Sequence, residues 1–248
     1  MGIRKNARKL TTCNYMSQCS NYRGSSLLNT CYKVLTNVLH RGLVPYGKEI
    51  LGDYQRGFRK GRSTADSLFM LSCVLEKFYE LNLELHLLFI DFKQVYNSIN
   101  RTYLYEILKE LVIPEKLANL IKMMLQDSNR KIKILGKWTA AFGIERGWRQ
   151  GDALSTALFN IVLGKVIKNI ETNSNGTIFN RTRQYIAYAD DVLILGRSVS
   201  EIEEVVTQSK EAAVSTGLVI NKSKTKYMKK NKNITNLEQD LITNGQVF

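Results

Sequence analysis

With 248 residues, 44% of them hydrophobic, the chain is long enough to bury a core as one large domain or two closely packed subdomains. This hydrophobic share excludes an intrinsically disordered tail. The formal net charge of +14, from 36 basic and 22 acidic residues, favours an anionic partner, with nucleic acid as the first candidate. Basic residues gather at both ends of the chain, in residues 1–62 and 222–232, which favours a binding surface over a merely soluble one.

The remaining composition argues against secretion, membrane insertion and a zinc site. The N-terminus is basic, but no apolar run follows it, so no signal peptide is predicted. The longest apolar runs are too short to span a membrane, and we expect no membrane partner. The cysteines and histidines fit no zinc-ligand spacing, so the cysteines are expected to be reduced thiols. These features indicate an intracellular protein of the nucleus or the cytoplasm.

The first third of the chain is predicted to contain two helices joined by a basic loop. Apolar residues recur at helical spacing over about residues 26–43, and the Val44-Pro45-Tyr46-Gly47 segment is expected to end that helix. A loop with two glycines follows over residues 53–64. Thr64 can cap a second helix, which is predicted to continue to about Leu83.

The middle of the chain predicts a strand, several helices and a hairpin. Residues 85–92 form a short apolar run bounded by polar residues, which is typical of a buried strand. Helical patterns follow near residues 101–111 and 115–127. Residues 131–144 are expected to form a hairpin around Gly136-Lys137, and Asp152 to cap the next helix.

The last third predicts a strand pair and another helix. Residues 184–196 are expected to form two short strands about a tight turn. Residues 199–216 show an amphipathic helical pattern, and Gly217 suits its C-terminal cap. The chain as a whole predicts an α+β fold, in which helices pack on a small, largely antiparallel sheet.

Three carboxylates stand in or beside these apolar strands. Asp91 directly follows a run of apolar residues, and Asp190 and Asp191 lie at the predicted turn. Each has an ordinary structural interpretation, Asp91 as a cap and the pair as a hairpin tip. An ionised carboxylate in such surroundings is nevertheless costly unless a cation compensates it. Mg²⁺ prefers carboxylate, water and phosphate oxygens, and two such ions can clamp the oxygens of a phosphoryl transfer.

Several segments, taken in order, resemble the motifs of reverse transcriptases. The Tyr188-Ala-Asp-Asp191 segment resembles the signature hairpin of that family. The match is strengthened by further segments that resemble other motifs of the family and occur in the same order. These segments are residues 21–24 with 26–29, 55–64, 89–96, 149–155 with 158–160, and 217–221 with 224–226. The resemblance covers about residues 20–240 and is closest to non-LTR (LINE-type) retrotransposon polymerases.

The resemblance implies the fingers and palm of a right-hand polymerase. Residues 21–84 would form a fingers-like region, and residues 85–230 a palm-like catalytic region with a return to the fingers near 129–146. Residues 1–20 are atypical of the usual lead-in to the fingers. Residues 231–248 would be a truncated C-terminal segment, with the thumb missing or incomplete.

The resemblance also implies roles for matching positions. Asp91, Asp190 and Asp191 would hold two Mg²⁺ ions, for which Mn²⁺ could substitute, and Lys224 would protonate the leaving pyrophosphate. Residues of the nucleotide pocket would be Phe92, Tyr96, Gln150, Gly151 and Arg59, and residues on the template phosphates Arg23 and Arg62. Tyr96 would stand against a ribose 2′-OH and favour deoxynucleotides. Most of these side chains also have an ordinary structural interpretation: Tyr96 could be a core aromatic residue, and the arginines could simply be solvated at the surface.

The expected activity is RNA-directed DNA synthesis on an RNA template with a DNA primer and dNTPs. The alternatives are a catalytically inactive nucleic-acid-binding fragment of such an element and a maturase related to those of group II introns, which would need a basic domain after the thumb. The chain departs from the family pattern at Val95, Asn97 and Thr156, two of which flank Tyr96. The sequence gives no indication of oligomeric state.

Overall fold

The computed structural model of the protein describes residues 26–93, 95–126, 128–134, 136–149, 151–170, 184–231, 242–243 and 246–247. Arg23 and Gln150, two of the expected binding residues, lie outside this set, as does the N-terminal segment of residues 1–20. The expected C-terminal segment of residues 231–248 lies mostly outside it.

The described residues alternate helices with short strands in the order expected of an α+β protein. The helices are α1 (Thr30–Ile50), α2 (Thr64–Glu80), α3 (Val95–Ser98), α4 (Arg101–Glu110), α5 (Glu115–Leu125), α6 (Ala153–Asn169) and α8 (Val199–Thr216). The strands are β1 (Leu85–Ile90), β2 (Asn129–Arg130), β3 (Lys133–Ile134), β4 (Lys137–Trp138), β5 (Phe142–Gly143), β6 (Tyr185–Tyr188), β7 (Asp191–Gly196), β8 (Lys226–Lys230), β9 (Ile242–Thr243) and β10 (Gln246–Val247).

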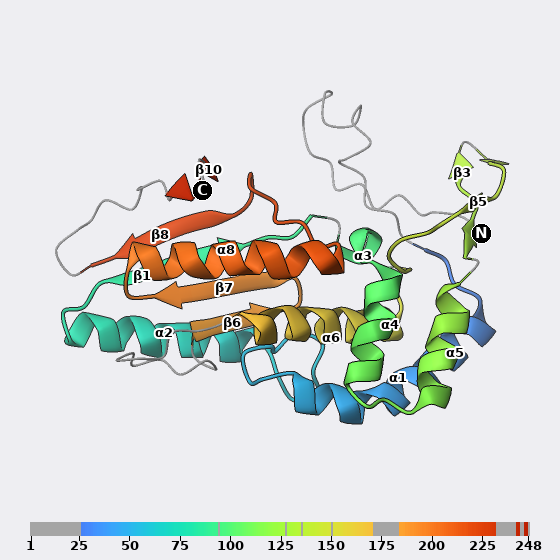
Figure 1. The fold of residues 1–248 in the computed structure, drawn as a ribbon, viewed down its shortest axis with the longest axis horizontal. Helices are drawn as coiled ribbons and strands as arrows, with labels where there is room; N and C mark the ends of the chain where they lie inside the picture. The colour runs from blue at the N-terminus through green and yellow to red at the C-terminus, as the bar shows by residue number, and fades with distance from the viewer. Residues whose placement is uncertain are drawn as a thin grey trace.

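A four-stranded sheet in the order β6-β7-β1-β8 forms the centre of the fold, and each of its strand pairs is antiparallel. Figure 1 shows α6 and α8 on one side of this sheet, with α8 running along the strands, while α2 lies on the other side. Alternate β1 side chains face opposite ways, so Leu88 and Ile90 pack with α6 and α8, and Leu85 and Leu87 pack with α2. The expected fold class is confirmed.

Local capping chemistry explains where several helices begin and end. Asp152 caps α6 as predicted, because its carboxylate accepts a hydrogen bond from Leu154 N at 3.1 Å. Gly217 ends α8 in the left-handed region, with φ of 81°, also as predicted. The cap of α2 is Ser63 rather than Thr64, since Ser63 and Asp66 form a reciprocal capping box.

The structure corrects two further expectations. The first helix does not end at residues 44–47: α1 runs on to Ile50 with Pro45 inside it. Proline removes a single backbone hydrogen bond, and Leu43 packs in the core on the preceding turn, so the helix survives it. Strand β8 was not predicted, because its lysines obscure the alternation of apolar and polar residues that is typical of a strand. In the structure it pairs with β1, with Met228 opposite Leu87. No helix among the described ranges is both long and apolar enough to cross a membrane.

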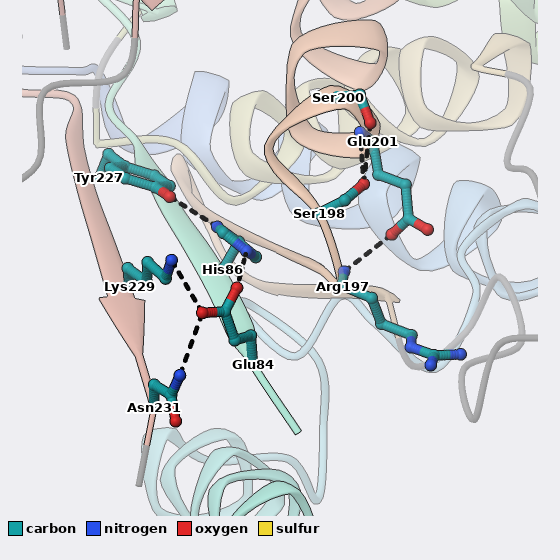
Figure 2. A network of polar contacts seen from close by, with 9 residues as sticks. All are labelled: Glu84, His86, Arg197, Ser198, Ser200, Glu201, Tyr227, Lys229 and Asn231. Atoms are coloured by element: carbon teal, nitrogen blue, oxygen red, sulfur yellow. Dashed lines mark hydrogen bonds and ion pairs between the residues drawn. The ribbon is translucent and has the colours of Figure 1, made fainter. Parts of the chain in front are cut away.

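A polar network lies at the end of the sheet away from Asp91 (Figure 2). His86 is buried, with 2% of its surface exposed, and its Nδ1 lies 2.6 Å from the Tyr227 hydroxyl. Glu84 accepts from Lys229 at 2.8 Å, and its other oxygen lies 3.7 Å from His86 Nε2. Glu201 of α8 also faces this network. Burial lowers the pKa of His86, so the ring is neutral at pH 7.

The free energy of unfolding is expected to fall as the pH drops below about 6.5, the ordinary pKa of histidine. Burial lowers the pKa of His86 in the folded protein and outweighs the opposing Glu84 carboxylate. The unfolded chain therefore binds the proton first, and this group costs up to about 1.4 kcal/mol per pH unit. Urea unfolding from about pH 7.5 to 5.5 should show a shallower pH slope for His86→Gln than for the wild type. Equal slopes would contradict the assignment.

Candidate active site

Three carboxylates lie at one end of the two central strands of the sheet, where β1 ends and β7 begins. Ile90, the last residue of β1, pairs with Val192 of β7. Asp91 directly follows Ile90, and Asp191 is the first residue of β7. Asp190 occupies the turn between β6 and β7. The fold thus places side by side the strand ends that carry these acids, although they are far apart in the sequence.

Asn221 fixes the orientation of the Asp91 carboxylate. Its Nδ2 donates to Asp91 Oδ2 at 2.8 Å, and its backbone N–H donates to Asp91 O at 2.8 Å. A charge-assisted bond of this kind restricts the rotamer of a half-buried carboxylate. Asn221 lies in a segment similar to a family motif, but no role was predicted for it, because the contact joins residues 130 positions apart.

Tyr96 of α3 lies between the acids and α6. Its ring centroid is 6.0 Å from that of Phe159, and its carbonyl accepts from Trp148 N at 2.8 Å. Burial, together with the negative charge of Asp190, raises the pKa of Tyr96 to about 12. The phenol is therefore protonated at neutral pH and lies within electrostatic range of Asp190.

The turn of the hairpin is held from outside by residues that sequence analysis did not single out. Ala189 has φ of +58°, an uncommon conformation for a residue other than glycine. The wholly buried Gln55 side chain hydrogen-bonds both backbone groups of Ala189. Asn160 of α6 in turn donates to Gly57 O at 3.0 Å. An asparagine among the apolar residues of the middle of α6 was the available signal for this contact.

Phe92 and Gly151, two of the expected nucleotide-pocket residues, can offer backbone groups rather than side chains to a ligand. The Phe92 ring is buried in the core, so its side chain cannot line a pocket. Its backbone forms a bridge with Ile220 in which Lys93 N and Asn221 N donate across, so the Phe92 N–H points away from that segment. Gly151 has φ of +99° with open space where a side chain would begin.

The expected basic residues are partly engaged within the protein. Arg59 Nη1 donates to the carbonyls of Gly52 and Gln55, at 2.9 and 3.0 Å, and so braces its own loop. Arg62 pairs with the exposed Asp53 at 2.8 Å. Lys224 is exposed in the turn that follows Asn221. The structure thus leaves all three side chains at the surface or close to it.

Three further arginines gather beside this site. Arg130 Nη2 donates to Trp148 O at 3.2 Å, and the Arg149 guanidinium stacks 4.4 Å from the Tyr32 ring centroid. Burial and the charge of Arg149 lower the pKa of both Arg101 and Arg130. Within the described ranges, Arg130 Nε is buried without a hydrogen-bond partner. Such a concentration of positive charge suits an anionic ligand.

The carboxylate oxygens of Asp91, Asp190 and Asp191 are of the chemical type that Mg²⁺ prefers among protein ligands. Within the part of the chain that the structure describes, no three Asp, Glu, His or Cys side chains gather closely enough to hold a metal. Mg²⁺ is commonly bound through one or two carboxylates, with water and substrate phosphates completing its shell. The residues therefore fit an ion whose coordination the substrate completes.

Comparison with known proteins identifies the family. The model for "Reverse transcriptase (RNA-dependent DNA polymerase)" matches residues 3–239. The chain belongs to the reverse transcriptase family. The predicted resemblance to the polymerase of a non-LTR retrotransposon is confirmed by similar proteins of transposable elements.

Two such relatives illustrate how far the similarity of this reverse transcriptase extends. The "Transposon TX1 uncharacterized 149 kDa protein" of Xenopus laevis is 24% identical over 207 residues, covering 82% of this chain and 16% of the relative. The "Retrovirus-related Pol polyprotein from type-1 retrotransposable element R2" of Popillia japonica is 26% identical over 179 residues, covering 71% and 25%. The chain thus spans a quarter or less of the length of these relatives.

A solved telomerase structure shares the fold of this reverse transcriptase. The telomerase of Candida Tropicalis, solved in complex with the TWJ fragment of telomeric RNA, superimposes with a TM-score of 0.62. The match covers 88% of this chain and 37% of the telomerase chain at 15% identity. At this identity the likeness concerns the fold alone.

Proposed function

We propose that the chain is the polymerase core of a retrotransposon and extends a primer 3′-OH with deoxynucleotides on an RNA template. The observation that carries this proposal is that Asp91 and Asp190 lie at the neighbouring ends of the paired central strands β1 and β7, with Tyr96 within electrostatic range of Asp190, in a reverse transcriptase chain. Residues 21–84 would act as fingers and residues 85–230 as palm. The proposed partners are an RNA template, a DNA primer and dNTPs.

Different residues of the chain would serve different roles in phosphoryl transfer. Asp91, oriented by Asn221, and Asp190 with Asp191 would hold two Mg²⁺ ions. When bound, such ions supply charge neutralisation of the triphosphate and activation of the primer hydroxyl. The backbone N–H of Phe92, which points away from residues 219–221, would suit a phosphate oxygen. Gln150 and Gly151 would line the nucleotide, and Lys224 would supply the proton for the leaving pyrophosphate.

Basic side chains would hold the template–primer without reading its sequence. Arg62 and Arg23 are the proposed template contacts of the fingers, and Arg130 and Arg149 extend the positive surface. Arg59 would instead contact the incoming triphosphate. Contacts of this kind track the phosphate backbone and weaken with salt. The net charge of +14 supports them.

Primer extension tests the proposal directly. The purified chain, given an RNA template, an annealed DNA primer, dNTPs and Mg²⁺, should lengthen the primer, and chelation of the metal should stop it. Binding of the same heteroduplex is measured in parallel by fluorescence anisotropy at low and high salt. Salt-sensitive binding without extension under any Mg²⁺ or Mn²⁺ condition would overturn the polymerase proposal and favour an inactive binding fragment.

Replacing Tyr96 with alanine is expected to admit ribonucleotides. The ring is packed against Phe159 and would fill the space that a ribose 2′-OH needs. Selection of this steric kind is worth about tenfold or more, so the preference for dNTPs over rNTPs, as a ratio of kcat/KM values, should fall by at least that factor. Tyr96→Phe keeps the ring and loses only the hydroxyl, and should retain the preference. Relaxed selection in both variants would contradict a steric role.

A further inference from the structure

We propose that Gln55 is a positioning residue for the catalytic hairpin and sets the direction of its turn from the neighbouring loop. This inference rests on the proposed function, because it assigns the turn at Asp190 a catalytic purpose. Gln55 touches neither substrate nor metal site in our assignment. It acts through Ala189, the residue immediately before Asp190.

The amide of Gln55 matches the turn atom by atom. Its Nε2 donates to Ala189 O at 3.1 Å, and its Oε1 accepts from Ala189 N at 3.1 Å. The same oxygen accepts from Gly57 N at 2.8 Å. Gln55 has no exposed surface, so water does not compete for these bonds. One side chain thereby satisfies both backbone groups of Ala189.

Ala189 needs such support because of its backbone conformation. Its φ of +58° lies in the left-handed region, where a Cβ atom is strained. Strained residues of this kind persist where the surrounding structure over-determines them, and they cluster at functional sites. The two bonds from Gln55 act on that one residue, so they select the direction in which the chain enters Asp190.

The loop that carries Gln55 is itself fastened to the sheet. Arg56 N donates to Ala187 O at 2.9 Å, and Ala187 N donates to Tyr54 O at 2.8 Å, so residues 54–56 run parallel to β6 as a short added strand. At Gly57 a Cβ atom would lie 2.1 Å from Ala189 N, so only glycine permits this approach.

Helix α6 also holds this loop through a hydrogen bond. The buried Asn160 donates its Nδ2 to Gly57 O at 3.0 Å. The brace therefore links three parts of the chain, α6, the loop and the hairpin. A rigid brace of this kind is what positioning of a catalytic group requires.

The test replaces Gln55 with methionine, which has similar length and makes none of the three bonds. The expected result is a fall in kcat of at least about tenfold, with KM for the primer–template within about twofold, since positional errors near reacting groups act on kcat. Gln208→Met, the same exchange in α8, should leave kcat unchanged. Gln55→Glu keeps the acceptor and loses the donor, so it should give an intermediate kcat; it carries the test if the methionine variant does not fold.

Hydrogen exchange separates this proposal from the polymerase assignment. Amide exchange at residues 188–191 should accelerate by at least about tenfold in Gln55→Met and by less in Gln55→Glu, which keeps the acceptor for Ala189 N, with exchange in β1 unchanged. That readout needs no catalysis, so it remains valid if the wild type fails to extend primers. Unchanged exchange at the turn, or a fall in kcat that only follows global unfolding, would overturn the proposed brace.

Discussion

Exchange of Asp190 for asparagine is expected to reduce primer extension by at least roughly 10³-fold while heteroduplex binding changes little. The change keeps the size of the side chain and removes the charge next to Tyr96. Metal-assisted stabilisation of a phosphoryl transfer is worth several kcal/mol, and each 1.36 kcal/mol corresponds to about tenfold in rate. Single-turnover extension with saturating template–primer measures the effect on the chemical step.

The matched control removes a carboxylate charge elsewhere. Glu110 pairs with Lys165 on the surface, away from the three carboxylates of the site, and surface pairs of this kind contribute little. Glu110→Gln should therefore extend primers within about twofold of wild type. Extension by Asp190→Asn within tenfold of wild type would remove Asp190 from the proposed site.

Replacing Gly147 with alanine is expected to destabilise the protein by about 3 kcal/mol or more, from backbone strain and overpacking together. The residue has φ of +64°, and a Cβ atom there would lie 2.2 Å from Tyr96 O and 2.6 Å from Asn97 Cα. Those neighbours are backbone atoms, so they cannot swing away. The same clash displaces Tyr96, and nucleotide selection should weaken with stability. Thermal unfolding should show a fall of roughly 6–12 °C.

Gly136 provides the control for backbone strain alone. It too has a positive φ, of 83°, but none of the residues that the structure describes lies within 4 Å of its Cβ position. Gly136→Ala should cost only about 1–2 kcal/mol, the ordinary penalty of the left-handed region. Equal losses for the two variants would show that the close approach to Tyr96 contributes nothing.

Much of the fold was predictable because its signals are local. The strand before Asp91, the hairpin at Asp190 and the capped start of α6 each follow from a few neighbouring residues. Pro45 misled the prediction because a breaker is also a local signal, whereas burial of Leu43 on the turn before it is a tertiary effect. Where local and tertiary preferences disagree, a short stretch of sequence shows only the local preference.

The site was predictable in its acids but not in their supports. Asp91 and Asp190 stand out because carboxylates are costly in apolar strands. Gln55 and Asn221 do not stand out, since a polar residue in a loop needs no special explanation. Their importance lies in single contacts across 134 and 130 residues, which no period or spacing reveals.

The central position of β1 has a consequence for synthesis of the chain on the ribosome. Both of its neighbours, β7 and β8, are encoded far downstream, so this apolar strand emerges with two unpaired edges. At about 5–20 residues per second, the roughly 100 residues that separate Ile90 from its partner Val192 take on the order of ten seconds to make. During that interval β1 is a template for wrong pairing. We expect nascent chains arrested before residue 191 to aggregate or bind chaperones, and chains released after residue 231 to do so much less.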